Sequence, residues 1–277
     1  MGIQLGPLLE TRRIKVEELS GQRVAIDGYN VLYQFLTSIR QADGSLLTDS
    51  EDRVTSHLSG ILFRFSKLVE NGLKLCIVFD GKPPALKKNI LEERRQRKIK
   101  AQIEWEAAIE AGDIETARTK AQQTTRLDPN MITESKNLLD LLGIPWVDAP
   151  SEGEAQVASL LNQGMVDYGA SQDFDTLLYG APIMIRNLTL SGKRKLPKQQ
   201  KWINIDMEKI VLEKVLDKLP RDPKTGTARL QAPMMLIQAG LANGSLTAEA
   251  LDASGRLGAG DPRRRPGPRL WSTRNHA

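Results

Sequence analysis

The sequence has little of the chemistry that zinc sites and nucleophilic triads use. Its 277 residues include one cysteine and two histidines, His57 and His276. One cysteine excludes an internal disulfide and a multi-cysteine zinc site, and two histidines leave little room for His-based zinc ligation or a Ser-His-Asp triad. No apolar run approaches the roughly 18 residues of a membrane-spanning helix. Catalytic chemistry must therefore come from carboxylates, lysines, arginines or hydroxyls.

The net charge of +5 is unevenly distributed. Residues 220–277 hold 9 Lys+Arg and 4 Asp+Glu, which leaves 30 of each before position 220. The whole excess belongs to this last segment, so nucleic-acid binding has to be judged from local basic segments. We expect a globular protein in the cytoplasm, without a membrane partner, because no signal peptide or membrane span is recognisable.

Apolar runs with strand character alternate with helical patterns before position 220. Strands are predicted at 23–27, 73–79, 144–148, 166–171 and 183–189, and helices at 30–40, 58–69, 130–142 and 153–163. This alternation predicts an α/β fold with a mostly parallel central sheet and helices on both faces. Ligand sites in such sheets lie at the carboxyl ends of the strands.

Two segments depart from this alternation. Residues 81–129 form a long insertion, in which 86–111 lacks Gly and Pro and predicts a charged helix, and 113–126 predicts a second helix after Gly112. Residues 220–277 contain 7 Gly and 6 Pro, and eight of their nine basic residues are Arg. That composition, without helical or strand period, predicts little fixed structure in this atypical C-terminal part.

Acidic residues follow several of the predicted strands. They are Asp27, Asp80, Glu152, Glu154, Asp173 and Asp175. Six carboxylates at one sheet edge repel each other unless a cation is bound, and oxygen-only ligands suit Mg²⁺ or Mn²⁺. Two ions about 4 Å apart would use this many ligands and would stabilise the attacking and leaving oxygens of a phosphodiester.

Each acidic motif also has a simpler explanation. Ser151-x-x-Glu154 is a capping box, and the Asp-Gly pairs at 27–28 and 80–81 are ordinary turn chemistry. Asp173-x-Asp175 fits a solvated loop. The coincidence of all four at strand ends is what favours a metal site.

Two basic segments lie close to these acids in the sequence. Residues 82–100 hold eight Lys or Arg, and 186–201 hold six with no acid. A charge run is usually a solvated face, but cations beside a carboxylate-bound metal suit a phosphodiester substrate. Tyr33 follows Asp27 by less than two helical turns and is either a core aromatic or a platform for base stacking.

The chain resembles the archaeal and eukaryotic flap endonucleases of the XPG-type structure-specific nucleases. The matching segments are MGIQ, AIDGYNVLYQFL, TSHLSG, VFDGKPP, APSEGEAQ, ASQDFDTLL and RNLTLSGKRKLP, which span residues 1–219 in order. The resemblance implies a PIN-like 5′-nuclease core over 1–219, with an N-terminal region over 1–98, a helical arch over about 81–129 and an internal nuclease region over about 116–219.

The resemblance also implies roles for individual residues. Asp27, Asp80, Glu152 and Glu154 would hold one Mg²⁺, and Asp173 and Asp175 a second together with Glu154, with Mn²⁺ as a substitute. Lys87 and Arg94 would be catalytic contacts to the phosphate. The implied DNA-binding residues are Gly2, Tyr33, Lys82, Lys88, Arg97, Lys193, Arg194 and Lys195. The implied partners are DNA with a 5′ flap or junction and a sliding clamp.

After position 219 the resemblance stops. The family continues with a GTDYN segment that carries another metal ligand, then a helix–hairpin–helix module and a clamp-binding motif, and none of these is recognisable in 220–277. We therefore hypothesise a frameshift or truncation that lowers activity.

The expected function is a structure-specific 5′ flap endonuclease and 5′-3′ exonuclease of DNA replication and repair. One alternative is a non-catalytic nucleic-acid-binding remnant of such an enzyme. Another is a haloacid-dehalogenase-like phosphatase, because Asp173-Phe-Asp175-Thr176 resembles its signature, although Leu177 departs from it.

Overall fold

The computed structural model describes residues 9–41, 44–82, 88–113, 116, 119–121, 124–190, 193–195 and 202–217. The predictions for residues 220–277 lie outside these residues, and the predicted helix at 113–126 is only partly covered. In the described residues, no helix is long and apolar enough to cross a membrane.

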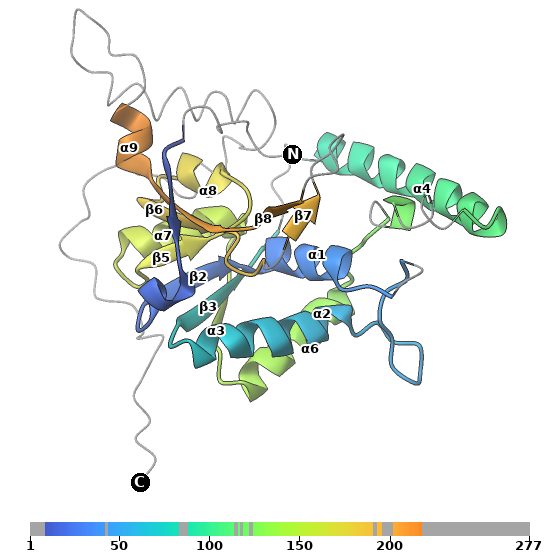
Figure 1. The fold of residues 1–277 in the computed structure, drawn as a ribbon, viewed down its shortest axis with the longest axis horizontal. Coiled ribbons are helices and arrows are strands. Elements are labelled where there is room, and N and C mark those ends of the chain that lie inside the picture. Colours follow the sequence, from blue (N-terminus) through green and yellow to red (C-terminus); the bar gives the residue numbers. More distant parts are fainter. Residues whose placement is uncertain are drawn as a thin grey trace, which may run out of the picture.

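A seven-stranded sheet forms the centre of the molecule (Figure 1). Its order is β1-β9-β6-β5-β2-β3-β4, with β1 at Thr11–Ile14, β2 at Arg23–Asp27, β3 at Lys74–Phe79, β4 at Trp146–Asp148, β5 at Tyr168–Ala170, β6 at Ile183–Arg186 and β9 at Met207–Val211. Each pair of adjacent strands in the series β6, β5, β2, β3 and β4 is parallel, whereas β9 is antiparallel to both β6 and β1. The predicted mostly parallel α/β sheet is confirmed.

Helices cover both faces because the buried strands alternate their side chains. Val24 and Ile26 of β2 join one core cluster, which contains α1 and α6, while Ala25 joins another with α7. The elements of the first face are α1 at Gly28–Ser38, α2 at Ser56–Gly60, a π-helical turn η3 at Ile61–Phe65, α3 at Ser66–Glu70 and α6 at Pro129–Leu141. The second face carries α7 at Gly153–Asn162 and α8 at Asp175–Leu178.

The structure differs from the sequence prediction at several places. The predicted helix at 58–69 is divided into α2, η3 and α3, although its apolar spacing continues through the π turn. The strands β1 and β9 were not predicted, since β1 buries only Ile14 and β9 only Ile210. The short hairpin of β7 at Lys193–Lys195 and β8 at Trp202–Asn204 was also missed.

The helix α4, at Lys88–Glu110, projects away from the sheet (Figure 1). It matches the helix predicted for 86–111, and Gly112 follows it with a φ of +69°. Among the described residues, the contacts of α4 with other parts of the chain include the ion pair of Glu104 with Lys120 and the position of Lys98 over the ring of Tyr33 in α1. The remaining described elements are a 3₁₀ turn η2 at Val16–Leu19 and α9 at Leu212–Asp217.

Candidate metal centre

The strand register explains why distant acidic residues meet. Asp27 ends β2 and pairs with Val78 of the parallel β3, so Asp80 follows β3 at the same edge. On the other side of β2, Ile26 pairs with Ala170 of β5, which places Ser171 at the level of Asp27. The carboxyl ends of three neighbouring strands therefore converge, as expected for ligand sites in parallel sheets.

Asp27 is the most buried of the six acids, with 3% of its surface exposed. It caps α1 by accepting a hydrogen bond from the backbone N–H of Asn30 (3.0 Å), and its second oxygen accepts one from the Ser171 hydroxyl (3.3 Å). Burial raises the pKa of Asp27 to about 7, and the nearby charge of Asp80 adds to this rise. A cation near this carboxylate would offset both the loss of hydration and the repulsion by Asp80.

The second group of acids lies where the loop after β3 meets the start of α7. Asp80 Oδ1 accepts a hydrogen bond from the backbone N–H of Gly153 at 2.7 Å. Glu152 is the N-cap residue of α7, and Glu154 lies in its first turn. Burial raises the pKa of Glu154 well above its usual value, and the charges of Asp27 and Asp80 raise it further. Asp27, Asp80 and Glu154 therefore share one electrostatic environment.

The third group follows β5. The Asn30 side chain donates a hydrogen bond to Asp173 Oδ2 at 3.2 Å, which connects this loop to α1. Asp175 begins α8 and is only 9% exposed. Arg186 holds the loop from β6, since its Nε donates to the Gln172 carbonyl (3.2 Å) and its guanidinium lies 4.3 Å from the centre of the Phe174 ring.

The donor chemistry of these six acids fits a hard divalent cation. All six offer oxygen ligands, and burial with like charges disfavours the ionised state of Asp27 and Glu154 unless positive charge is bound. In the part of the chain that the structure describes, no three His, Cys, Asp or Glu side chains form a ready-made metal-binding group. The fold thus brings the acids to one edge of the sheet, where their charges interact, but their side chains do not surround a single metal position.

Of the simpler explanations of the acidic motifs, the capping box and the solvated loop do not agree with the structure, whereas a local role for Asp27 does. The capping box is absent: Glu152, not Ser151, is the N-cap of α7, and the Ser151 hydroxyl donates to the Lys82 carbonyl (3.3 Å). Asp27 does have a local structural role as the cap of α1, but this uses only one of its two oxygens. The loop containing Asp173 is tied to α1 rather than freely solvated.

Of the DNA-binding residues predicted from the sequence, Tyr33 has the clearest position. Its ring lies under Lys98 of α4, with the Lys98 Nζ 5.0 Å from the ring centre and 3.4 Å from the hydroxyl oxygen. Tyr33 is half-buried, so it is not a core aromatic. Lys82 and Arg97 are exposed, and Arg97 forms a surface ion pair with Glu93 (3.5 Å).

Other predicted residues cannot be placed. Gly2 and Lys87 lie outside the described residues. For five more, only the backbone is described: Lys88 and Arg94 in α4, and Lys193, Arg194 and Lys195 in β7. Their proposed contacts to DNA stay predictions.

Sequence reasoning missed several residues of the site. Asn30 lies three positions after Asp27, and that helical spacing could have identified it. Lys98 follows Arg94 by four residues, which places both on one face of α4. Nothing in the local sequence indicates that Tyr179 belongs to the site. Its buried hydroxyl has no hydrogen-bond partner among the described residues. Burial, followed by the charges of Glu152 and Glu154, raises the pKa of Tyr179.

The pH dependence of folding offers a test of this electrostatic environment. With a chelator present to remove divalent cations, the free energy of unfolding is expected to fall as the pH rises from 3.8, the ordinary pKa of an Asp, through about 7, the pKa of Asp27 in the fold. The reason is that the folded state binds the Asp27 proton more tightly than the unfolded chain does. Denaturant titrations of wild type and Asp27→Asn at a series of pH values measure this, since the amide does not titrate and can still cap α1. Their difference cancels the titrating groups that do not interact with Asp27, and a difference that is constant with pH would contradict the raised pKa.

Comparison with known proteins places the chain in a family. Residues 1–101 match the XPG N-terminal domain and residues 143–225 the XPG I-region. Flap endonuclease 1 of Pyrococcus abyssi is 50% identical over 219 residues, which are 79% of this chain and 64% of the relative, so the chain spans less than two thirds of that protein.

Solved structures agree with this placement. Flap endonuclease-1 from Methanococcus jannaschii has a TM-score of 0.58 at 35% identity, covering 91% of this chain and 83% of that chain. The catalytic core of Rad2 in complex with DNA substrate has a TM-score of 0.53 at 22% identity, covering 90% of this chain and 76% of that chain, and shows a shared fold alone. With 35% identity over most of a solved flap endonuclease and matches to both XPG regions, the chain belongs to the XPG family.

Proposed function

We propose that the chain is a divalent-cation-dependent nuclease that hydrolyses DNA near the base of a 5′ flap. The observation that carries this proposal is the convergence of Asp27, Asp80 and Glu154 in one buried electrostatic environment, with further acids beside them. A buried group of carboxylates is unfavourable unless it binds cations, and this is the arrangement that metal-assisted phosphodiester hydrolysis requires. The names of the relatives support the substrate class.

The proposed cation is Mg²⁺, with Mn²⁺ as a substitute, and two ions are proposed. Asp27, Asp80, Glu152 and Glu154 would hold one ion, and Asp173 and Asp175 the other together with Glu154. When bound, the ions would supply positive charge that stabilises the negative charge developing on the phosphodiester oxygens. The carboxylates of the chain would hold that charge at the sheet edge, where Ser171 and Asn30 already fix two of them.

Residues of α1 and α4 would position the DNA. Tyr33 of α1 offers an aromatic ring, and the Lys98 Nζ lies over it, 5.0 Å from the ring centre. Stacking of a base on Tyr33 would compete with Lys98 for the ring, which frees the ammonium to contact a phosphate. Lys87, Arg94 and the basic residues of β7 are proposed as further phosphate contacts. The sliding clamp implied by the family resemblance is a further proposed partner.

The second candidate function is nucleic-acid binding without catalysis. One observation favours it: among the described residues, no group of three acids is ready-made for a metal. The basic segments around residues 82–100 and 186–201 would then carry the function alone.

An assay that scores binding and cleavage separately decides between the two. The chain is mixed with a 5′-flap DNA in Mg²⁺ or in EDTA; a mobility shift reports binding and a denaturing gel reports product. We expect binding in both conditions and a product with a 5′-phosphate only in Mg²⁺, because the acids need the cation and the basic residues do not. Binding that weakens steeply with salt, without product in Mg²⁺, would favour the non-catalytic alternative.

A further inference from the structure

A closed ring of hydrogen bonds connects the ends of β2 and β5 beside the acids. Asn30 contributes two bonds: its backbone N–H donates to Asp27 Oδ1 (3.0 Å), and its side-chain amide donates to Asp173 Oδ2 (3.2 Å). Ser171 contributes two more: its hydroxyl donates to Asp27 Oδ2 (3.3 Å) and accepts from the backbone N–H of Asp173 (3.2 Å). Two neutral residues therefore bridge Asp27 and Asp173: Asn30 bonds both carboxylates, and Ser171 connects the Asp27 carboxylate to the Asp173 backbone.

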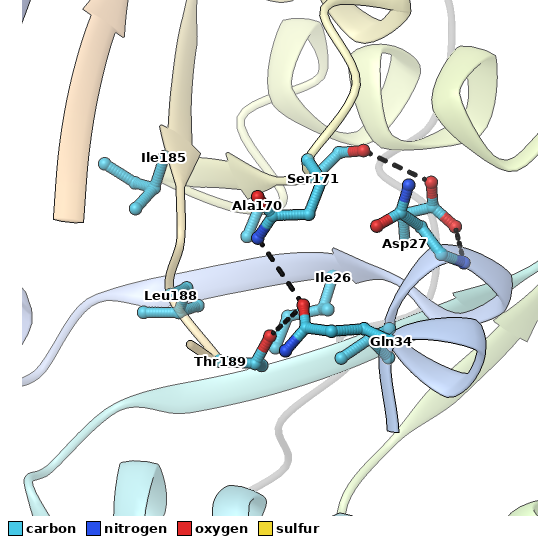
Figure 2. Close-up of a pocket in the computed structure, with 11 residues that line it drawn as sticks. Ile26, Asp27, Gln34, Ala170, Ser171, Ile185, Leu188 and Thr189 are labelled. Atoms are coloured by element: carbon cyan, nitrogen blue, oxygen red, sulfur yellow. Dashed lines mark hydrogen bonds between the residues drawn. The ribbon is translucent and has the colours of Figure 1, made fainter. Parts of the chain in front are cut away.

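The position of this ring follows from the strand register. Ile26 pairs with Ala170, so the residues that follow them, Asp27 and Ser171, lie side by side at the strand ends. Figure 2 shows the Ser171 hydroxyl reaching from the end of β5 to the Asp27 carboxylate, beside a cavity of about 10 Å³. Asn30 closes the ring from the first turn of α1.

The ring opposes a repulsion. Asp27 and Asp173 are close enough for the charge of Asp173 to disfavour ionisation of Asp27. Left to themselves, two such carboxylates would turn apart toward water. Three of the four bonds go to carboxylate oxygens, and hydrogen bonds to charged groups are stronger than those between neutral groups, so the ring opposes this repulsion before any cation arrives.

We propose that Asn30 and Ser171 are positioning residues that hold Asp27 and Asp173 together and thereby set the affinity of this site for divalent cations. This inference rests on the proposed function, because it assigns Asp27 and Asp173 to one cation-binding site. Neither Asn30 nor Ser171 needs to touch the cation. Their effect is to order two ligands, which follow different strands, before the cation binds.

The chain contains a matched control for Asn30. Gln34 lies one helical turn further along α1 and also makes its bonds through a side-chain amide: its Oε1 accepts from the Thr189 hydroxyl (2.9 Å) and from the Gln172 amide (3.5 Å). It lines the same cavity, as Figure 2 shows, but none of these bonds reaches a carboxylate. Asn30→Leu and Gln34→Leu therefore remove the same kind of group from the same helix.

The test is calorimetric titration of the full chain with Mn²⁺ at one fixed pH, without DNA. Loss of residues that orient metal ligands typically lowers affinity about 10- to 100-fold, so we expect at least about a 10-fold weaker Kd for Asn30→Leu and less than about a 2-fold change for Gln34→Leu. Thermal unfolding in EDTA checks that both variants fold. Should Asn30→Leu not fold, Ser171→Ala carries the test, with Ser171→Thr expected to restore affinity because it keeps the hydroxyl.

The outcomes separate this inference from the proposed function. If wild type binds Mn²⁺ and Asn30→Leu binds it equally well, or if Gln34→Leu loses as much affinity, the positioning role is wrong and the cation site stands. If wild type itself binds no Mn²⁺, the cation site fails and the positioning role fails with it.

Discussion

Replacing Asp80 by Asn is expected to reduce Mg²⁺-dependent cleavage of a 5′-flap DNA at least about 1000-fold, because the variant removes one negative charge from the proposed cation site and several kcal/mol of charge stabilisation with it. The fold should survive this change. The Asn side-chain oxygen can still accept the hydrogen bond that Asp80 Oδ1 accepts from Gly153 at 2.7 Å. Single-turnover cleavage with the protein in excess measures the chemical step, so weaker DNA binding does not distort the comparison.

Asp148→Asn is the matched control for this variant. Asp148 also ends a strand of the same sheet, but its side chain is 55% exposed and pairs with Lys136 at 2.6 Å. An exposed ion pair contributes only about 0–1 kcal/mol to stability, and Asp148 is not one of the six proposed ligands. Cleavage by Asp148→Asn should therefore match wild type. Undiminished cleavage by Asp80→Asn would overturn the assignment of Asp80 to the cation site.

Gly81→Ala is expected to lower cleavage about 100-fold by moving the two halves of the site apart, since a displacement of about 1 Å can cost that much. A Cβ at position 81 would lie 2.1 Å from the Ala149 carbonyl oxygen and 2.8 Å from the Pro150 carbonyl. These are backbone atoms and cannot rotate away. The loop that contains them leads directly into Glu152 and α7, so relieving the clash shifts Glu152 and Glu154 relative to Asp80.

The same substitution should also destabilise the fold. Overpacking costs typically about 1–3 kcal/mol, and the hydrogen bond from the Gly81 N–H to the Ser151 carbonyl (2.7 Å) is strained by the same displacement. Gly112→Ala is the control, because its Cβ meets nothing within 4 Å and only its φ of +69° costs energy, about 1 kcal/mol. Denaturant unfolding and single-turnover cleavage of both variants measure the two effects. A Gly81→Ala protein as active as Gly112→Ala would show that this contact does not set the site.

The sequence by itself was enough to predict the sheet and the acids at its edge. Val24, Ala25 and Ile26 form a run that is typical of a strand buried on both faces, and an acid that follows such a strand lies at its carboxyl end. Because parallel strands align these ends, the sequence also predicts that Asp27 and Asp80 lie at the same edge, and the structure shows that their strands are neighbours. The edge strands β1 and β9 could not be predicted, since each buries a single large apolar side chain.

Only the tertiary structure decided which neutral groups hold the acids. The spacing of Asn30 from Asp27 is a local signal for their contact, but nothing local indicates that Asn30 also reaches Asp173 or that Ser171 reaches Asp27. Nothing local to Gly153 indicates that it donates to Asp80. Local sequence specifies the spacing of apolar residues that favours a helix or a strand, and the residue at which that element ends. Contacts between residues more than 70 positions apart depend instead on strand register and on the depth at which each helix packs, and these are fixed by the whole core.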